Sequence, residues 1–260
     1  MIRRRSISPL TPQQFFNEVL LSSLFWPNKT VRLERHSTID YRHRSLSSQI
    51  SISELYHENS KLFPQMLPQL TATVSQTDAI RDEFVRRRAI VVAASGTEPF
   101  PLEPSYRELV IEISRTTPKE LFYAVDIRVV AGGLAAVFEP INRAFQVVKR
   151  FTDEEMGILR RGIKLLSSSD SLANDTPLIL VLGSFARNEL LLGSRGYRRT
   201  LLDAGRVVQE IFRTAERFGV EIHPIYEFID RDLDQAMDAD GVEQGTLMVL
   251  ELNGGETYAL

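Results

Sequence analysis

Apolar positions in the second half of the chain alternate between helical spacing and short unbroken runs. The segment FTDEEMGILRRGIKLL begins with Thr152 and Glu155, which form the pattern of a capping box, and then repeats apolar residues on one helical face. PLILVLGSF, residues 177–185, is a continuous apolar run of strand length, as is typical of a central strand covered on both faces. We expect a helix followed by a buried strand.

Residues 193–219, GSRGYRRTLLDAGRVVQEIFRTAERFG, predict a long helix that faces the core. Its apolar residues recur close to every 3.6 positions, and Gly219 supplies the stop. These apolar residues are Leu201, Ala204, Val208, Phe212, Ala215 and Phe218. After this helix, VEIHPIYEF predicts a strand, DRDLDQAMDAD a short acidic helix and GTLMVLELNGG a final strand.

The region before residue 150 is less clearly patterned. In TDAIRDEFVRRRAIVVAASG, Thr77 is a good N-cap for a short helix through Arg88, and AIVVAA then suits either a short buried strand or a helix end. YRELVIEISRT, residues 106–116, predicts a strand. ELFYAVDIRVVAGGLAAVFEPI predicts one or two more strands, with a turn at Gly132-Gly133.

The chain divides into residues 1–70, an N-terminal helix and extended arm, and residues 71–260, one folded domain. The arm begins with a predicted helix from Thr11 to about Leu24 and then becomes polar and basic. In the domain, helices and strands follow one another along the chain. This order predicts an α+β or α/β sandwich in which helices cover a sheet.

Composition excludes several classes of function. A net charge of −3 and a pI near 5.9 give no field that would attract nucleic acid. No apolar run is long enough to span a bilayer, and no signal-type apolar region follows the basic start, so we expect a cytoplasmic protein. The chain has no cysteine, and its four histidines lack metal-ligand spacing, so we expect no metal site.

The C-terminal third resembles a known family. The segment LLGSRGYRRTLLDAGRVVQEIFRTAERFG, with the strand before it and the acidic segment and strand after it, resembles the end of the SagB/McbC-type dehydrogenases, a branch of the FMN-dependent nitroreductase-like flavoproteins. Two weaker upstream similarities are YHENSKL and EPSYRELVIEI. The corresponding motif residues are Arg195-Gly196-Tyr197-Arg198, Ala204-Gly205, Gln209-Glu210, Phe218-Gly219, Asp232-Leu233 and Thr246 to Gly254.

This resemblance implies a specific fold and activity. The fold would be α+β, a nitroreductase-like sandwich with a central, mostly antiparallel sheet flanked by helices. The activity would be oxidation of azolines to azoles on a ribosomally made peptide, with FMN as hydride acceptor at a dimer interface. The implied partners are a second nitroreductase-like subunit, in a homodimer or heterodimer, a cyclodehydratase of the YcaO type and the precursor peptide.

The sequence also departs from the family pattern. Leu191-Leu192 stands where the family has a catalytic Lys-Tyr pair, so we name no catalytic residue. Pro104-Ser105-Tyr106 stands in place of the glycine-containing loop that lies against the flavin. The early R-x-S-x-R phosphate motif is absent, and the arginines of FVRRRA are the nearest basic cluster. The candidate FMN contacts are Arg195, Gly196, Arg198, Ser105, Tyr106, Arg86 and Arg88.

Each candidate contact also has an ordinary structural explanation. Guanidinium groups at a helix start can bind phosphate, but they can equally reach solvent or carboxylates. The arginines of FVRRRA also suit a solvated helix face. The alternative function is therefore a degenerate, non-catalytic subunit that pairs with a catalytic dehydrogenase or with the cyclodehydratase in the same complex.

Overall fold

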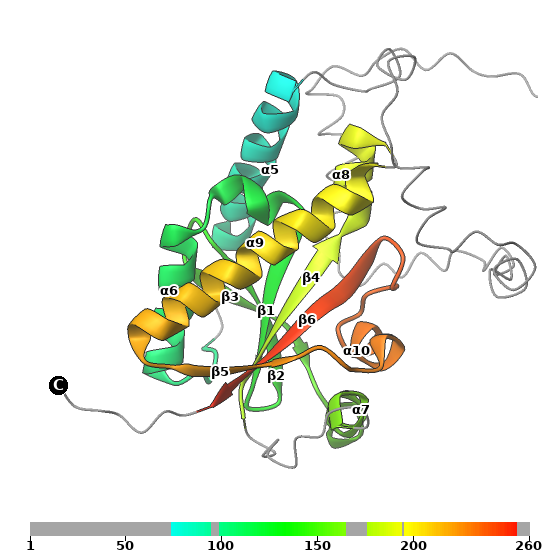
Figure 1. The fold of residues 1–260 in the computed structure, drawn as a ribbon. Helices are drawn as coiled ribbons and strands as arrows, with labels where there is room; N and C mark the ends of the chain where they lie inside the picture. The colour runs from blue at the N-terminus through cyan, green and yellow to red at the C-terminus, as the bar shows by residue number, and fades with distance from the viewer. Residues whose placement is uncertain (1–73, 95–98, 165–175, 194, 254–260) are drawn as a thin grey trace, which may run out of the picture.

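The computed structural model describes residues 74–94, 99–164, 176–193 and 195–253 (Figure 1). The described residues form a six-stranded sheet of order β3-β2-β1-β4-β6-β5 in which every pairing is antiparallel. This sheet and its helices confirm the α+β expectation. The strands are β1 (Val125–Ala131), β2 (Leu134–Glu139), β3 (Ala144–Arg150), β4 (Leu178–Ser184), β5 (Glu221–Ile225) and β6 (Gln244–Asn253).

Helices cover both faces of the sheet, and each face has its own apolar core (Figure 1). The first core lies under α5, α6 and α9, and the second under α7 and α10. The helices are α5 (Val74–Ala94), α6 (Pro104–Thr116), η3 (Lys119–Tyr123, a 3₁₀ helix), α7 (Asp153–Lys164), α8 (Phe185–Leu192), α9 (Arg195–Phe218) and α10 (Asp230–Ala236).

The central strand and the helix before it agree with the sequence expectation. All seven residues of β4 are buried, and the strand pairs with β1 on one side and β6 on the other. The capping box of α7 is also confirmed. The backbone N–H of Glu155 donates to Thr152 Oγ1 over 3.2 Å, and the backbone N–H of Thr152 donates to a Glu155 carboxylate oxygen over 2.9 Å.

The predicted glycine turn is confirmed as the connection between β1 and β2. Gly132 and Gly133 have φ values of 54° and 73°, the positive values that a two-residue turn of this kind requires. Gly219 has a φ of 65° directly after α9, and it ends that helix as expected. The predicted β5, α10 and β6 are also present in the predicted order.

The strand predicted over residues 106–116 is wrong, because this segment is helix α6. Pro104 stands in the first turn, where a missing N–H costs little. Tyr106, Leu109, Val110 and Ile113 are all buried, and their spacing places them on one helical face. The β-branched residues of VIEI favoured a strand locally, but burial of this face outweighs that preference.

The segment before α6 also differs from one expectation. Helix α5 begins at Val74, so Thr77 lies inside the helix and is not its N-cap. The helix continues through AIVVAA to Ala94, which shows that this run is a helix end and not a buried strand. The predicted helix from Thr11 to Leu24, the rest of the arm and the YHENSKL motif lie outside the described residues.

Candidate functional site

The segment Arg195–Arg198 begins α9 at the place where this helix meets α8. Gly196 is buried there, and a Cβ atom at this position would lie only 2.2 Å from the backbone nitrogen of Glu189. No other residue fits so close to the backbone of α8. The glycine of the R-G-Y-R motif is therefore required for the packing of the two helices.

The polar side chains below this contact tie the two helices together. Thr200 Oγ1 donates to the backbone oxygen of Gly196 over 3.0 Å and accepts a hydrogen bond from the side-chain amide of Asn188 over 2.9 Å. Asn188 in turn accepts from a guanidinium nitrogen of Arg81 over 2.7 Å. This buried chain of contacts joins α5, α8 and the start of α9.

The side chains of the R-G-Y-R motif and of the next residue have different surroundings. Arg195 is exposed, Arg198 is half-buried, and Arg199 forms an ion pair of 2.8 Å with the buried Asp203 one turn later. Tyr197 stacks on Phe185 of α8, with ring centroids 4.5 Å apart. Arg195 is thus the motif arginine that reaches the surface most openly.

The two leucines before this motif belong to the hydrophobic interior. Leu191 is 1% exposed and is part of the first core, and Leu192 is half-buried and packs against the same core. A lysine at position 191 would place its charged end in an apolar environment. The geometry therefore gives this pair a packing role.

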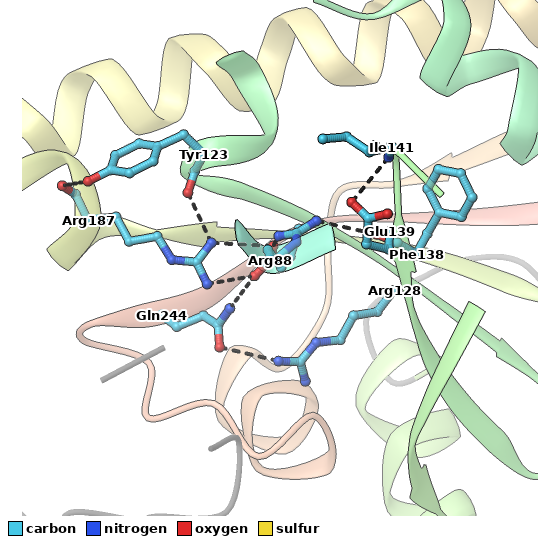
Figure 2. A network of polar contacts seen from close by, with 9 residues as sticks. Arg88, Tyr123, Arg128, Phe138, Glu139, Ile141, Arg187 and Gln244 are labelled. Carbon is cyan, nitrogen blue, oxygen red and sulfur yellow. Dashed lines mark hydrogen bonds and ion pairs between the residues drawn. The ribbon is translucent and has the colours of Figure 1, made fainter. Parts of the chain in front are cut away.

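A buried ionic network centred on Asp126 lies at the same end of the sheet, because Asp126 is opposite Leu182, near the end of β4 that leads into α8. Figure 2 shows its partners Arg88, Arg187 and Gln244. Arg187 of α8 approaches both carboxylate oxygens of Asp126 at 3.3 and 3.2 Å, and Arg88 of α5 forms a short ion pair with one of them. The side-chain amide of Gln244 donates to the same carboxylate over 3.1 Å. Four separate elements thus meet at one acid.

The electrostatics of this network favour the ionised acid. Burial alone would raise the pKa of Asp126, but the guanidinium groups of Arg187, Arg88 and Arg128 hold it well below its usual range. Arg128 reaches the network through Gln244, whose side-chain oxygen accepts from it over 3.2 Å, and it also donates to the backbone oxygen of Met237. The network therefore anchors α10 and β6 to β1.

Tyr123 completes the network on the side of the first core. Its hydroxyl donates to the backbone oxygen of Arg187 over 2.9 Å, and the Arg187 guanidinium donates back to the backbone oxygen of Tyr123 over 3.0 Å. Figure 2 shows these two residues facing each other. Burial raises the pKa of the Tyr123 hydroxyl, and the nearby Arg187 and Arg81 oppose this effect only in part.

The candidate FMN contacts are not all brought together. Arg88 forms an ion pair with Asp126. Arg86 is exposed on α5, and one of its guanidinium nitrogens lies 3.7 Å from a carboxylate oxygen of Glu83. Ser105, in the first turn of α6, is exposed, and its hydroxyl donates to a carboxylate oxygen of Glu103 just before the helix. Tyr106 is buried, and its hydroxyl donates to the backbone oxygen of Leu252 over 3.5 Å.

The two main groups of candidate contacts lie at opposite ends of the sheet. Tyr106 contacts Leu252, near the end of β6, whereas Gln244, at the start of β6, pairs with Ser184 just before α8. The eight steps from residue 244 to residue 252 correspond to about 26 Å of strand. Within one chain, the described residues therefore do not form an FMN site from both groups.

The Asp126 network was not recognised from the sequence, although a signal was present. Asp126 and Arg128 are two charged residues at alternate positions of an otherwise apolar strand, VDIRVVA, and both are buried. Charges on a buried strand require partners, so this pattern could have indicated a polar network.

Among the described residues, no cluster of three or more potential metal ligands occurs. None of the described helices has both the length and the apolar character needed to cross a bilayer.

Comparisons with known proteins support the fold. No family model matches the chain, and no curated protein matches it. Among solved structures, a candidate nitroreductase from Anabaena variabilis is similar with a TM-score of 0.55 at 16% identity, over 78% of this chain and 46% of that one. The chain thus has a nitroreductase-like fold and spans less than half of that relative.

Two other similar structures are more distant. One is a chain of the E. coli microcin synthetase McbBCD complex with truncated pro-MccB17 bound, with a TM-score of 0.49 and 15% identity over 58% of this chain and 63% of that one. The other is an FMN-dependent nitroreductase from Clostridium difficile, with a TM-score of 0.39 and 9% identity over 63% of this chain and 82% of that one.

Proposed function

We propose that this chain is a nitroreductase-fold subunit that contributes assembly, and not hydride transfer, to a peptide-modifying complex. The observation that carries this proposal is the burial of Leu191 in the first core, with Leu192 packed beside it. The SagB/McbC-type dehydrogenases place their acid/base pair at the corresponding position. In this chain the same position stabilises the fold.

The engagement of the basic residues supports the same conclusion. Arg88 and Arg187 neutralise Asp126, and Arg199 neutralises Asp203. A guanidinium that already binds a buried carboxylate would have to break that ion pair before it could bind a phosphate. Gly196 packs on the backbone of α8, and this contact accounts for the glycine without an anion.

The proposed partners follow from the resemblance of residues 175–254 to the SagB/McbC-type dehydrogenases. They are a catalytic dehydrogenase of the same fold or a YcaO-type cyclodehydratase, and the complex would act on a precursor peptide carrying azolines. The share of this chain would be to hold the partner and the peptide in place.

The first experiment is a flavin titration of the purified full chain. We expect a colourless protein that gives no flavin spectrum shift and no quenching of FMN fluorescence, whereas a SagB/McbC-type dehydrogenase treated in the same way serves as the positive control. We also expect the chain to form a complex with the dehydrogenase or the cyclodehydratase. Stoichiometric FMN binding together with azole formation by the chain alone would overturn the proposal.

A second candidate function is FMN-dependent azoline oxidation by this chain itself. The observation in its favour is the exposed Arg195, with Arg198 beside it, at the start of a 24-residue helix. A second subunit would then have to supply the remaining FMN contacts. Under this function, Arg195→Ala and Arg198→Ala should each weaken FMN binding, whereas the solvent-facing control Arg206→Ala should not.

A further inference from the structure

A cleft of about 420 Å³ lies between the C-terminal end of α6 and the last turns of α9, and we call it the α6–α9 cleft. The two helices contact each other there, since Oγ1 of Thr116 lies 3.5 Å from Oγ1 of the buried Thr214 (Figure 1). The lining residues are Thr116 of α6 and Glu210, Arg213, Glu216 and Arg217 of α9. All of these side chains are polar or charged, so the cleft does not suit an apolar ligand.

The α6–α9 cleft is separate from the candidate FMN contacts. Arg195 begins α9, and the 22 steps from residue 195 to residue 217 correspond to about 33 Å of helix. Ser105 and Tyr106 lie at the other end of α6, in its first turn. A ligand in the cleft therefore does not use the flavin site that the family resemblance implies.

The charged side chains on the α9 wall of the cleft are only partly paired. Arg213 donates to Glu210 in an ion pair of 3.2 Å. Arg217 donates to the neutral hydroxyl of Thr214 over 3.2 Å and has no carboxylate partner in the part of the chain that the structure describes. Glu216 is exposed and, within the same ranges, takes part in no ion pair. The wall thus offers one cation and one anion to a ligand.

The α6 wall of the cleft favours positive charge. Helix α6 ends at Thr116, so the negative end of its dipole lies at the cleft. The Thr116 hydroxyl donates to the backbone oxygens of Glu112 and Ile113, each at 3.3 Å, so the lone pairs of its own oxygen remain for a donor. A cationic group is therefore favoured at this wall, and an anionic group is favoured beside Arg217.

We propose that the α6–α9 cleft binds a small zwitterion, either an α-amino acid or a short peptide with both termini free. A simple anion would meet the carboxylates of Glu210 and Glu216, and a simple cation would meet two guanidinium groups. A zwitterion avoids both conflicts, because its ammonium group lies at Thr116 and Glu216 while its carboxylate accepts from Arg217 in charge-assisted hydrogen bonds. The cleft has the volume of a small-molecule site, for which about 300–1,000 Å³ is usual.

The expected binding is weak and independent of flavin. Arg217 and Glu216, the two charged groups that hold the ligand, are exposed, and ion pairs at exposed positions contribute little. We therefore expect a dissociation constant on the order of 1 mM. The inference goes beyond the proposed function, since it concerns this chain alone and is measured without FMN or a partner protein.

The first test is isothermal titration calorimetry of the full chain with diglycine and with two analogues that each lack one charge. N-acetyldiglycine has no ammonium group, and diglycinamide has no carboxylate. We expect saturable binding of diglycine, and binding of each analogue that is at least about fivefold weaker. Equal binding of diglycine and either analogue would overturn the proposal.

Glycine distinguishes the two sources of the zwitterion in the same titration. A site for free amino acids binds glycine at least as well as diglycine, whereas a site for peptides binds it more weakly, and both results support a zwitterion site. The absence of saturable binding of both glycine and diglycine up to about 20 mM would overturn the proposal.

Two matched variants of α9 locate the site. Arg217→Gln removes the guanidinium that receives the carboxylate, whereas Arg206→Gln removes an exposed guanidinium of the same helix that does not line the cleft. We expect Arg217→Gln to weaken diglycine binding at least about fivefold, and Arg206→Gln to weaken it less than about twofold. Circular dichroism checks that both variants fold. Binding that responds equally to the two substitutions, or to neither, would contradict a site between α6 and α9.

Discussion

Two buried acids on the same face of the sheet, Asp126 and Glu251, have opposite surroundings. Asp126 of β1 is opposite Leu182 of β4, and Glu251 of β6 is opposite Leu178 of the same strand. Asp126 has three charged or polar side chains bound to its carboxylate. Glu251 is 0% exposed, and neither of its carboxylate oxygens has a hydrogen-bond partner among the described residues.

This difference indicates how the chain distributes its polar interactions. The end of the sheet near Asp126 is where α5, α8 and the start of β6 meet, and the acid joins these elements through charge-assisted hydrogen bonds. At the other end, the part of the chain that the structure describes supplies no hydrogen-bond donor to the buried carboxylate of Glu251. We therefore expect Asp126 to stabilise the fold and Glu251 to lower its stability.

The largest effect is expected for Asp126→Asn. The variant keeps the size of the side chain but leaves Arg88 and Arg187 buried without their counter-charge. Breaking a buried ion pair in this way costs about 3–5 kcal/mol. The free energy of unfolding at pH 7, from urea denaturation followed by circular dichroism, measures this loss. Glu154→Gln, at an exposed acid of α7, is the control and should change stability by less than about 0.5 kcal/mol. Equal stability of Asp126→Asn and the wild type would show that the network is not stabilising.

The same network predicts an acid-dependent loss of stability. Because the pKa of Asp126 is lower in the folded state than its ordinary value of 3.8, the unfolded chain binds a proton first as the pH falls. The stabilisation by the ionised Asp126 is thus fully present well above pH 3.8 and decreases as the pH falls below it. The stability that is lost on acidification within an accessible pH range is therefore smaller than the stability lost in Asp126→Asn. The difference in unfolding free energy between wild type and Asp126→Asn should be constant from pH 5 to 7, and should shrink below about pH 4. A difference that stays constant at lower pH would contradict the prediction.

A smaller effect of opposite sign is expected for Glu251→Leu. The substitution removes a buried carboxyl group without partners and places an apolar side chain beside Leu178, so the unfolding free energy should rise by about 1–3 kcal/mol. Glu221→Leu, at an exposed position of the neighbouring strand β5, should give no such gain. A loss of stability in Glu251→Leu would mean that the carboxyl group has a partner outside the described residues.

The sequence predicted most elements but not the two acids. Strand β4 and helix α9 were predictable because an apolar run of strand length bounded by polar and turn residues, and a 3.6-residue repeat sustained over several turns, are strong local signals. Helix α6 was not, since its β-branched residues concealed its helical face. The partners of Asp126 lie 38, 61 and 118 residues away along the chain. Only the folded structure brings such distant residues together, and no local pattern shows whether a buried acid will have a partner.

The R-G-Y-R motif shows the same limit at the candidate site. Its residues were correctly placed at the start of a long helix, because the turn and the apolar repeat are local features. The role of Gly196 depends on the distance to the backbone of α8, which the sequence does not contain. A glycine that permits close packing and a glycine that leaves room for an anion have the same sequence pattern.

The smallest effect is expected for Tyr123→Phe, which removes a single neutral hydrogen bond from the end of the sheet near Asp126. The backbone oxygen of Arg187 loses its donor, and the expected cost is about 1 kcal/mol. Because burial raises the pKa of Tyr123, its hydroxyl remains a donor well into alkaline conditions, and the cost should be the same at pH 7 and pH 9. Tyr226→Phe, at a side chain that is 71% exposed, is the matched control and should leave the unfolding free energy unchanged. A cost for Tyr123→Phe that equals that of Asp126→Asn would show that the network fails as a unit when any one contact is removed, and that its energy does not reside mainly in the ion pairs of the acid.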